Sequence, residues 1–562
     1  MSKTAQHTGA PLATMEFDYI VIGAGSAGCT VASRLTEDPS VTVALLEAGP
    51  HDHHYSVWTP IGLAGTVPKA GPRNYAYYTE PQPGLDGRGS YQPRGKGLGG
   101  SSSINAMIYI RGHCSDYDHW AALGCHGWAY DDVLPYFRRS ERNQRTEGRD
   151  DDPWHGGDGP LHVSDVRSPN PFSQRFVKAA VQAGVPLNDD FNGKEQEGVG
   201  LYQVTQRNGE RWNTARAYLH GGNAQDSAMN GGRKGLAVFT GTQALRVVFE
   251  GKRAVGVSAV RAGEKMTLRA RREVIVSGGA FNSPQLLLAS GIGPSEQLRS
   301  QGIAVVHDLP GVGENLQDHL DVIITKTVNT TDLFGYSLPG FARMLGEMVR
   351  YRRDRTGMFT SNFAEAGAFV KTKPDLAAPD VQLHFATAVL GNISPGKRAK
   401  PKHGYSCHAC VLRPKSRGFV RLRSPDTREM PVIDPRFLSA EEDMEGMVAG
   451  VRLMRKIFAQ PALAVMGGVD LQAGVFGPND SNDEAIRQFV RSIADSIYHP
   501  IGTCKMGTDN MAVVDPSLRV HGVQGLRVVD ASVMPTLVGG NTNAPTIMIA
   551  EKVADMIRAE YW

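Results

Sequence analysis

Two residues near the C-terminus have side chains suited to the oxidation of an alcohol. His499 lies in a Tyr-His-Pro run, and Asn541 lies in a Gly-Asn-Thr run. An imidazole titrates near neutral pH and can accept the hydroxyl proton that must leave before a hydride departs from the carbon. An amide does not compete for that proton, but it can hydrogen-bond the developing alkoxide. We therefore interpret His499 as the base and Asn541 as the orienting residue; a core histidine and a helix cap are the structural alternatives.

A glycine-rich turn near the N-terminus predicts a nucleotide site. An apolar run precedes Gly23, Gly25 and Gly28, and a helical stretch and a second apolar run follow, ending before Glu47. This strand–helix–strand order lets a pyrophosphate approach the N-terminus of the helix, and the acid can accept hydrogen bonds from ribose hydroxyls. The pattern alone does not separate FAD from NAD.

Longer motifs make the interpretation specific. The run 95–105 packs glycines and serines before an apolar stretch and resembles the first signature of the glucose-methanol-choline (GMC) oxidoreductases. The run 279–293 resembles the second signature, and further similar blocks occupy 311–319, 498–507 and 540–545. Because these motifs follow the family order along nearly the whole chain, the sequence is identified as similar to that family.

The resemblance implies that the cofactor is FAD, and it assigns site residues. It places His499 at the histidine of the family's catalytic pair and Asn541 at the second position, which is His or Asn among members. Where some members carry a histidine bonded covalently to the flavin, this chain has Gln92, so noncovalent FAD is expected. The expected FAD-binding residues are Gly23, Gly25, Ser26, Ala27, Gly28, Glu47, Ala48, Arg94, Gly95, Gly99, Gly100, Ser101, Asn105, Ala106, Met107, Val247, Asp530, Ala531, Asn541 and Thr542.

The order of apolar runs predicts an α/β chain with a discontinuous cofactor domain. Short apolar runs at 273–276 and 526–529 can join the sheet begun by the N-terminal strands, and the glycine-rich run 221–235 is expected to be a loop between domains. We expect a Rossmann-like FAD-binding domain and an α+β substrate domain whose mainly antiparallel sheet is backed by helices. The expected limits are 1–15 for a flexible tail, 16–160, 225–325 and 500–562 for the FAD-binding domain, and 161–224 and 326–499 for the substrate-binding domain.

Alternating residues mark the expected substrate domain. Every second residue from Val381 to Phe385 is apolar, which predicts a half-buried antiparallel strand. The runs 405–412 and 418–422 flank a turn-like segment and predict a hairpin in the same sheet. A helix that starts near Ser439 carries acidic residues first and basic residues last, and it is expected to back the sheet.

Several other reactive side chains are interpreted as structural. Cys407 and Cys410 have the spacing of a metal site, but no second cysteine pair completes one, so no metal is expected. His319 lies in a segment expected to hold the two domains together rather than to catalyse. Gln382 and His384 lie opposite the apolar face of their strand, where a substrate cavity and the solvent surface are equally good interpretations.

Composition limits the partners. The 562 residues include 60 Lys plus Arg and 57 Asp plus Glu, a formal charge of +3, so nucleic acid is not a favoured partner. Scattered cysteines suit a reducing compartment, the polar N-terminal tail lacks the apolar core of a secretory signal, and no apolar run reaches the ~20 residues of a membrane span. We expect a cytoplasmic protein. In the helix expected at 341–355, apolar residues mix with arginines, and a solvated cover is favoured over peripheral contact with the inner membrane.

These features predict an FAD-dependent oxidoreductase that converts a primary alcohol or polyol to an aldehyde or ketone. Hydride is expected to pass to flavin N5, with a quinone or another carrier, or oxygen, receiving the electrons. Choline dehydrogenase and aryl or furan alcohol oxidase are alternatives within the family, although the sequence reveals no carboxylate or aromatic cage for a quaternary ammonium. Hydroxynitrile lyase and fatty acid photodecarboxylase are alternatives of another class. No sequence feature indicates an oligomeric state.

Overall fold

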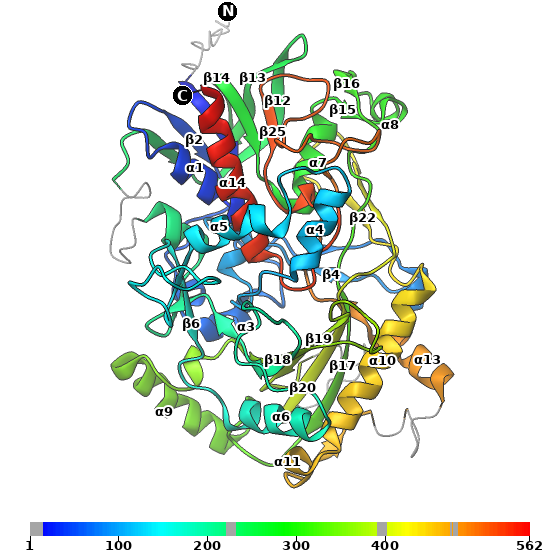
Figure 1. Cartoon of the computed structure of the whole chain (residues 1–562). Coiled ribbons are helices and arrows are strands. Elements are labelled where there is room, and N and C mark those ends of the chain that lie inside the picture. Colours follow the sequence, from blue (N-terminus) through cyan, green and yellow to red (C-terminus); the bar gives the residue numbers. More distant parts are fainter. Residues whose placement is uncertain (1–14, 221–231, 391–401, 473–474, 476–481, 562) are drawn as a thin grey trace, which may run out of the picture.

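The computed structural model describes residues 15–220, 232–390, 402–472, 475 and 482–561. Most of the predicted loop at 221–235 and nearly all of the predicted N-terminal tail lie outside these residues. In Figure 1 one large sheet occupies the upper part of the molecule and a second occupies the lower part, and helices cover both. This mixture of a partly parallel sheet, an antiparallel sheet and covering helices confirms the predicted α/β fold class.

The upper sheet joins strands that lie far apart in the sequence. β1 (Met15–Ile22) lies between β2 (Val43–Leu46) and β14 (Glu264–Val276), and both run parallel to it. β25 (Leu526–Val528) pairs in parallel with the end of β14, as the sequence predicted. β11 (Leu236–Phe239) lies beside β2 at one edge of the sheet. On the other side, the antiparallel β13 (Arg253–Arg261) lies beside β14, and β12 (Thr242–Glu250) lies beside β13.

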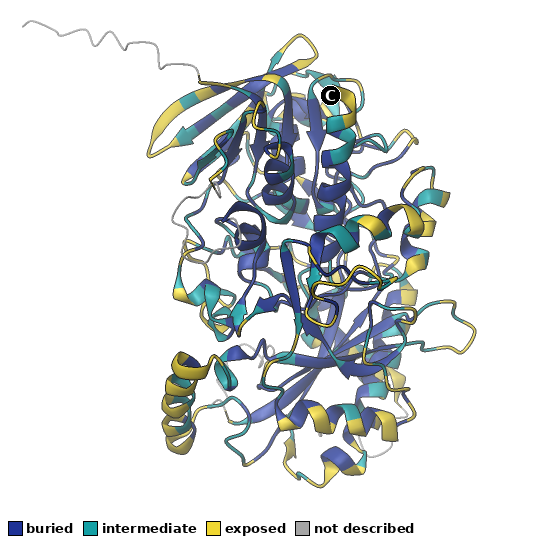
Figure 2. Ribbon diagram, turned by 60° about the vertical axis from the view of Figure 1, so that its left-hand side comes forward, coloured by how far each residue is buried: buried dark blue, intermediate teal, exposed yellow. Residues whose placement is uncertain are grey.

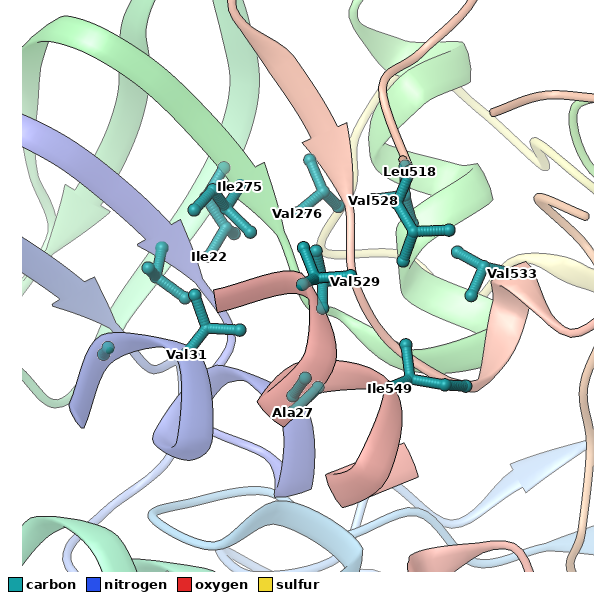
Figure 3. Packing of buried hydrophobic residues seen from close by; sticks show 14 of the residues in the cluster. Ile22, Ala27, Val31, Ile275, Val276, Leu518, Val528, Val529, Val533 and Ile549 are labelled. Atoms are coloured by element: carbon teal, nitrogen blue, oxygen red, sulfur yellow. The ribbon is translucent and has the colours of Figure 1, made fainter. Parts of the chain in front are cut away.

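The strands of the upper sheet are apolar because helices cover the sheet. Every residue of β2 is buried, as is typical of parallel strands covered on both faces. α1 (Ser26–Leu35) and α14 (Asn543–Tyr561) pack against each other, and α7 (Gly279–Ala289) packs on β12. Figure 3 shows apolar side chains of strands and helices, such as those of Ile22, Val31, Val528 and Ile549, filling this interior.

The lower sheet is antiparallel and is covered by helices on one face. α6 (Pro171–Gln182) and α10 (Glu441–Phe458) pack on it, which confirms the predicted helix and its backing role. Its strands in order are β23 (Val469–Asp470), β17 (Leu320–Thr327), β20 (Gly404–Val411), β19 (Val381–Ala386), β18 (Ala364–Val370) and β7 (Gly198–Leu201), with β24 (Asp495–Ser496) also paired to β17.

Two predictions for this sheet are wrong. The expected hairpin does not form, because β20 pairs with β17 and β19, whereas β21 (Phe419–Arg421) pairs with β22 (Val432–Asp434) in a separate sheet. The intervening segment leaves the sheet, since the backbone N–H groups of Lys415 and Ser416 donate to Asp443 at the start of α10. β19 is buried on both faces rather than one, because its polar side faces the interior of the molecule.

One expected domain limit falls inside a strand of the lower sheet, and another falls between two strands that pair with each other. β17 begins at Leu320, so it enters the lower sheet before the expected limit at 325. β5 (Glu141–Asn143) and β6 (Leu161–Asp165) pair in parallel across the expected limit at 160. Backbone pairing therefore continues across both points, and the division into domains remains a prediction.

One long helix stands apart at the lower left of Figure 1. α9 (Leu338–Asp354) packs mainly on the short 3-10 helix η5 (Met358–Thr360) and is the long helix that is almost wholly yellow in Figure 2. Within the part of the chain that the structure describes, no helix combines the length and apolarity needed to cross a bilayer.

Candidate active site

A cavity of about 1160 Å³ lies between the two sheets. This volume exceeds the ~300–1,000 Å³ of ordinary ligand pockets, which leaves room for a dinucleotide and a small substrate. All of the expected site residues line it except Gly28, Gly99 and Val247. Val247 instead lies in the core, and its N–H donates to Ser290 Oγ at 2.8 Å. A Cβ on Gly28 would lie 1.8 Å from the Gly23 carbonyl oxygen, so this glycine serves close packing.

Glycine backbones form a cradle that fits the pyrophosphate of FAD. Gly23 has a φ of +99°, and a Cβ added to Gly25 would meet no atom within 4 Å, so the backbone there opens to the cavity. A Cβ on Gly100 would lie 2.6 Å from Gly25 Cα, so the two glycine loops touch without side chains. No side chain caps the N-terminus of α1, which leaves its N–H groups available for an anion.

Glu47 closes one end of this cradle. Its Oε1 accepts from the N–H groups of Gly49 (2.8 Å) and Gly97 (2.9 Å), and its Oε2 accepts from Ala24 (3.0 Å). Burial raises the pKa of the carboxyl group. The residue thus joins the two glycine loops, and it lines the cavity, where a carboxylate can accept from a ribose hydroxyl.

His499 and Asn541 meet inside the cavity, although they come from different segments. Asn541 Nδ2 lies 3.1 Å from His499 Nε2, and both residues line the cavity. Burial, followed by the nearby His319, His384 and Arg94, holds the pKa of His499 well below its usual value. The imidazole is therefore neutral at neutral pH, which is the form that accepts a proton.

His319 fixes the tautomer of His499. Its Nε2 lies 2.9 Å from the carbonyl oxygen of Leu412, which can only accept, so the proton of His319 is on Nε2. Its Nδ1 is then an acceptor, and His499 Nδ1 at 3.0 Å must donate to it. This leaves His499 Nε2 without a proton and directed at Asn541. Burial lowers the pKa of His319 to about 4, so it remains neutral.

The side-chain amide of Asn541 is also held in one orientation. Its Oδ1 accepts from Gln382 Nε2 at 3.3 Å, and Gln382 Nε2 is 3.1 Å from the hydroxyl of Tyr202. The amide nitrogen of Asn541 therefore faces His499. Gln382 is buried but does not line the cavity, so it acts on the site through Asn541.

The backbone beside His499 is strained. Tyr498 has a φ of +75°, a conformation that L-residues rarely adopt and that concentrates at active sites. Arg94 donates to the Tyr498 carbonyl at 2.7 Å, and Asp318 Oδ1 accepts from the N–H of His499 at 2.8 Å. Asp318 also accepts from Gln92 and so links three segments. Burial raises the pKa of Asp318 to about 6 and lowers that of Arg94 to about 10.

Sequence reasoning missed most residues on the substrate side of the cavity; His384, for which a cavity was one of two interpretations, is the exception among those named below. Asp321, His408 and Asp495 line it, and Asp321 Oδ2 is hydrogen-bonded to His408 Nδ1. His384 also lines it, with Nδ1 lacking a hydrogen-bond partner in the described structure, and burial lowers its pKa to about 3. Phe363 also lines the cavity, and its backbone has a φ of +67°. The available signal was the polar alternation in β17, β19 and β20, which does not reveal which face holds a cavity.

Two other clusters have structural explanations. Cys407 belongs to the core behind the lower sheet and Cys410 to the cluster in front of it, so the two free thiols lie on opposite faces of β20. His51, Asp52 and His220 are the one group of described residues close enough together to share an ion. Hydrogen bonds account for this group, since Asp52 Oδ1 accepts from His220 Nε2 at 2.8 Å.

Comparisons with known proteins agree with this site. Two family models, both described as GMC oxidoreductase, match residues 17–321 and 414–550. The alcohol dehydrogenase [acceptor] of Pseudomonas putida is 46% identical over 96% of this chain and 95% of its own length. The mitochondrial choline dehydrogenase of Mus musculus is 45% identical over 97% of this chain and 89% of its own.

Solved structures share the whole architecture. A pyridoxine 4-oxidase from Mesorbium loti has 30% identity and a TM-score of 0.84, and covers 97% of this chain with 100% of its own. A variant of formate oxidase from Aspergillus oryzae has 27% identity and a TM-score of 0.86, and covers 97% of this chain with 99% of its own. The sequence matches, the sheet topology and the cavity together establish that this chain belongs to the GMC oxidoreductase family.

Proposed function

We propose that this chain, an FAD-dependent oxidoreductase acting on CH–OH donors, oxidises a primary alcohol or polyol with His499 as the base. The observation that carries the proposal is the 3.1 Å approach of Asn541 Nδ2 to the unprotonated Nε2 of His499. A hydroxyl oxygen that approaches both atoms from the cavity can donate its proton to His499 Nε2 and accept from Asn541 Nδ2, which replaces the direct contact between the two side chains. FAD, when bound, supplies the acceptor for the hydride that leaves the alcohol carbon.

The first experiment is anaerobic reduction of the purified protein in the dark. Primary alcohols, polyols and choline are added separately to wild-type protein, and bleaching of the flavin absorbance is followed. His499→Ala should keep its colour but bleach about 10²- to 10⁴-fold more slowly, the usual contribution of a general base. The exposed His126 provides the matched control His126→Ala. A yellow protein that no alcohol bleaches would contradict alcohol oxidation and favour the lyase or the photodecarboxylase.

Choline or another cationic alcohol is the second candidate substrate. Asp321 and Asp495 oppose each other on paired strands and both line the cavity, which supplies the carboxylates that the sequence did not reveal. A carboxylate pair in the cavity wall favours a quaternary or protonated amine. In the same panel, stronger bleaching by choline than by neutral alcohols would select this candidate.

We propose that the FAD is bound noncovalently and that a quinone receives the electrons. Gln92 is an amide whose Nε2 lies 3.1 Å from Asp318, so this position offers no nucleophile to the flavin. Acid precipitation should release the yellow colour into the supernatant, whereas a yellow pellet would contradict noncovalent binding. Faster turnover with a water-soluble quinone than with oxygen would support the proposed acceptor, and the reverse would make the protein an oxidase.

A further inference from the structure

α9 presents its apolar side chains to the outside of the molecule. Leu338, Phe341, Leu345 and Val349 are spaced three, four and four residues apart, so they share one face of the helix. Their exposed fractions are 89%, 66%, 48% and 60%. A surface helix of a globular protein normally turns such a stripe toward the core. Here the pattern is reversed, and contiguous exposed apolar surface marks an interaction site.

The outward orientation is fixed by contacts on the opposite side of the helix. Tyr351 is buried and stacks on Phe359 with ring centroids 5.8 Å apart. Glu347 Oε2 accepts from the N–H of Met358 at 2.8 Å, and the Ser337 side chain caps the first turn. These polar and aromatic contacts hold α9 by its inner face. Figure 1 shows the helix at the edge of the molecule.

The helix and the residue that follows it, Arg355, together carry an excess of positive charge. The segment 338–355 contains five arginines against Glu347 and Asp354, a net charge of +3. The whole chain has a formal net charge of +3, so the remaining residues sum to zero. Arg352 and Arg353 are exposed at the C-terminal end of the apolar stripe. Apolar side chains flanked by arginines are complementary to an anionic lipid surface.

We propose that α9 docks on the surface of an anionic lipid bilayer, with Leu338, Phe341, Leu345 and Val349 at the boundary between headgroups and acyl chains. The preceding Tyr336 is 81% exposed and suits the headgroup level, where amphipathic rings accumulate. Arg352, at the C-terminal end of the apolar stripe, then lies against the lipid phosphates, whereas Arg343, Arg350, Arg353 and Arg355 also pair with carboxylates of the chain.

The docking surface is joined to the wall of the cavity. Phe334, just before α9, packs against Phe363 with ring centroids 4.5 Å apart, and Phe363 lines the cavity. Phe334 also bridges to Ala388, two residues before Leu390, which lines the cavity as well. A bilayer bound to α9 therefore lies next to the part of the molecule that encloses the substrate side of the cavity.

Vesicle co-sedimentation of the full-length holoenzyme tests the proposal. Wild-type protein should sediment with phosphatidylcholine vesicles that contain phosphatidylglycerol, at least tenfold more than with phosphatidylcholine alone. The variant Leu338→Ser/Phe341→Ser/Leu345→Ser should lose this binding while its flavin content and its rate with a soluble alcohol stay unchanged. Leu187→Ser removes a side chain that is 68% exposed elsewhere and is the matched control. Arg352→Glu/Arg353→Glu should weaken binding to the anionic vesicles only.

Two results would overturn the proposal. The first is wild-type protein that ignores anionic vesicles or a triple variant that binds them equally well. The second is a dimer by light scattering that becomes a monomer in the triple variant, since α9 would then be covered by a second copy of the chain. A Phe341→Trp variant adds an independent measurement, because lipids brominated near the headgroup should quench its fluorescence only if the side chain enters the bilayer.

Discussion

The two halves of the cavity recognise their ligands by different means. The half under the upper sheet is built from backbone: Gly23, Gly25 and Gly100 leave space, and the N-terminus of α1 supplies N–H groups. The half over the lower sheet is built from side chains that project from adjacent strands, among them Asp321 and His384. Backbone recognition tolerates little change in sequence, whereas side-chain recognition changes with each residue. The first half is therefore suited to a constant cofactor and the second to a substrate that varies among relatives.

Gly100→Val is the change expected to break the backbone half. Its φ of +52° and the 2.6 Å between its Cβ position and Gly25 Cα leave no room for a side chain. FAD affinity should fall by at least about tenfold, or ~1.4 kcal/mol, and the purified protein should lose most of its absorbance near 450 nm. Gly71→Val is the control, since a Cβ there meets no atom within 4 Å. A fully yellow Gly100→Val protein would refute recognition by the glycine backbones.

His319→Ala should have the next largest effect. Loss of the acceptor for His499 Nδ1 should lower kcat by about tenfold, on the order of one lost hydrogen bond, with little change in KM. His319→Gln offers an acceptor again and should restore part of the rate.

The pH profile separates this positioning role from a loss of structure. In wild-type protein kcat/KM should rise with pH through the pKa of His499 and reach its plateau below pH 6.5, because that pKa is lowered. In His319→Ala the rising limb should move to higher pH, since His319 contributes to the lowering of the His499 pKa. An unmoved limb together with lower flavin content would mean that His319 is only structural.

Asp321→Asn tests recognition by side chains, because it changes the charge of the residue and little else. The variant keeps the shape of the wall but removes a carboxylate from the cavity. KM for choline should rise about fivefold, near 1 kcal/mol, while KM for a neutral alcohol of similar size stays the same. Equal changes for both substrates would place Asp321 outside substrate recognition and leave its bond to His408 as its role.

His384→Asn should change stability in acid rather than FAD binding or catalysis. Burial lowers the pKa of His384 to about 3, so the unfolded chain binds more protons below pH 6.5. This group therefore costs about 1.4 kcal/mol of unfolding free energy per pH unit as the pH falls from 6.5 toward 3. Denaturation at pH 7.5 and 5.5 should show a smaller acid loss in His384→Asn than in wild-type protein or in the exposed control His126→Asn. Equal losses would exclude His384 as a source of the acid sensitivity.

The same contrast explains what could be predicted from the sequence. The glycine loops, the strand ends around Glu47 and the pair His499–Asn541 were predicted because long local motifs carry them. Asp321, His384 and His408 come together only through the register of β17, β19 and β20, which the sequence does not encode locally. The predicted hairpin failed for a related reason, since a long-range bond from the backbone at Lys415 to Asp443 overrides the turn-like residues.

The expected role of His319 shows how far local reasoning reaches. The segment was expected to hold the two domains together; its Asp318 links distant segments through Gln92 and His499, and the domain role stays a prediction. Contact between His319 and His499 depends on two residues 180 positions apart and on the carbonyl group of Leu412. No spacing rule predicts such a contact, and only the assembled lower sheet reveals it.

The late position of β25 and α14 sets the order in which the molecule can be completed. β1 and β2 leave the ribosome first, but β14 gains its neighbour β25 only when residues 526–528 have been made, and the site gains Asn541 later still. Until then the sheet that contains β1, β2 and β14 lacks β25, and apolar surface exposed at this stage favours aggregation. The FAD site can therefore be completed only after Asn541 and α14 (Asn543–Tyr561) have been made. Deletion of the last turns of α14 should thus impair assembly, even though these turns lie far from the glycine loops along the chain.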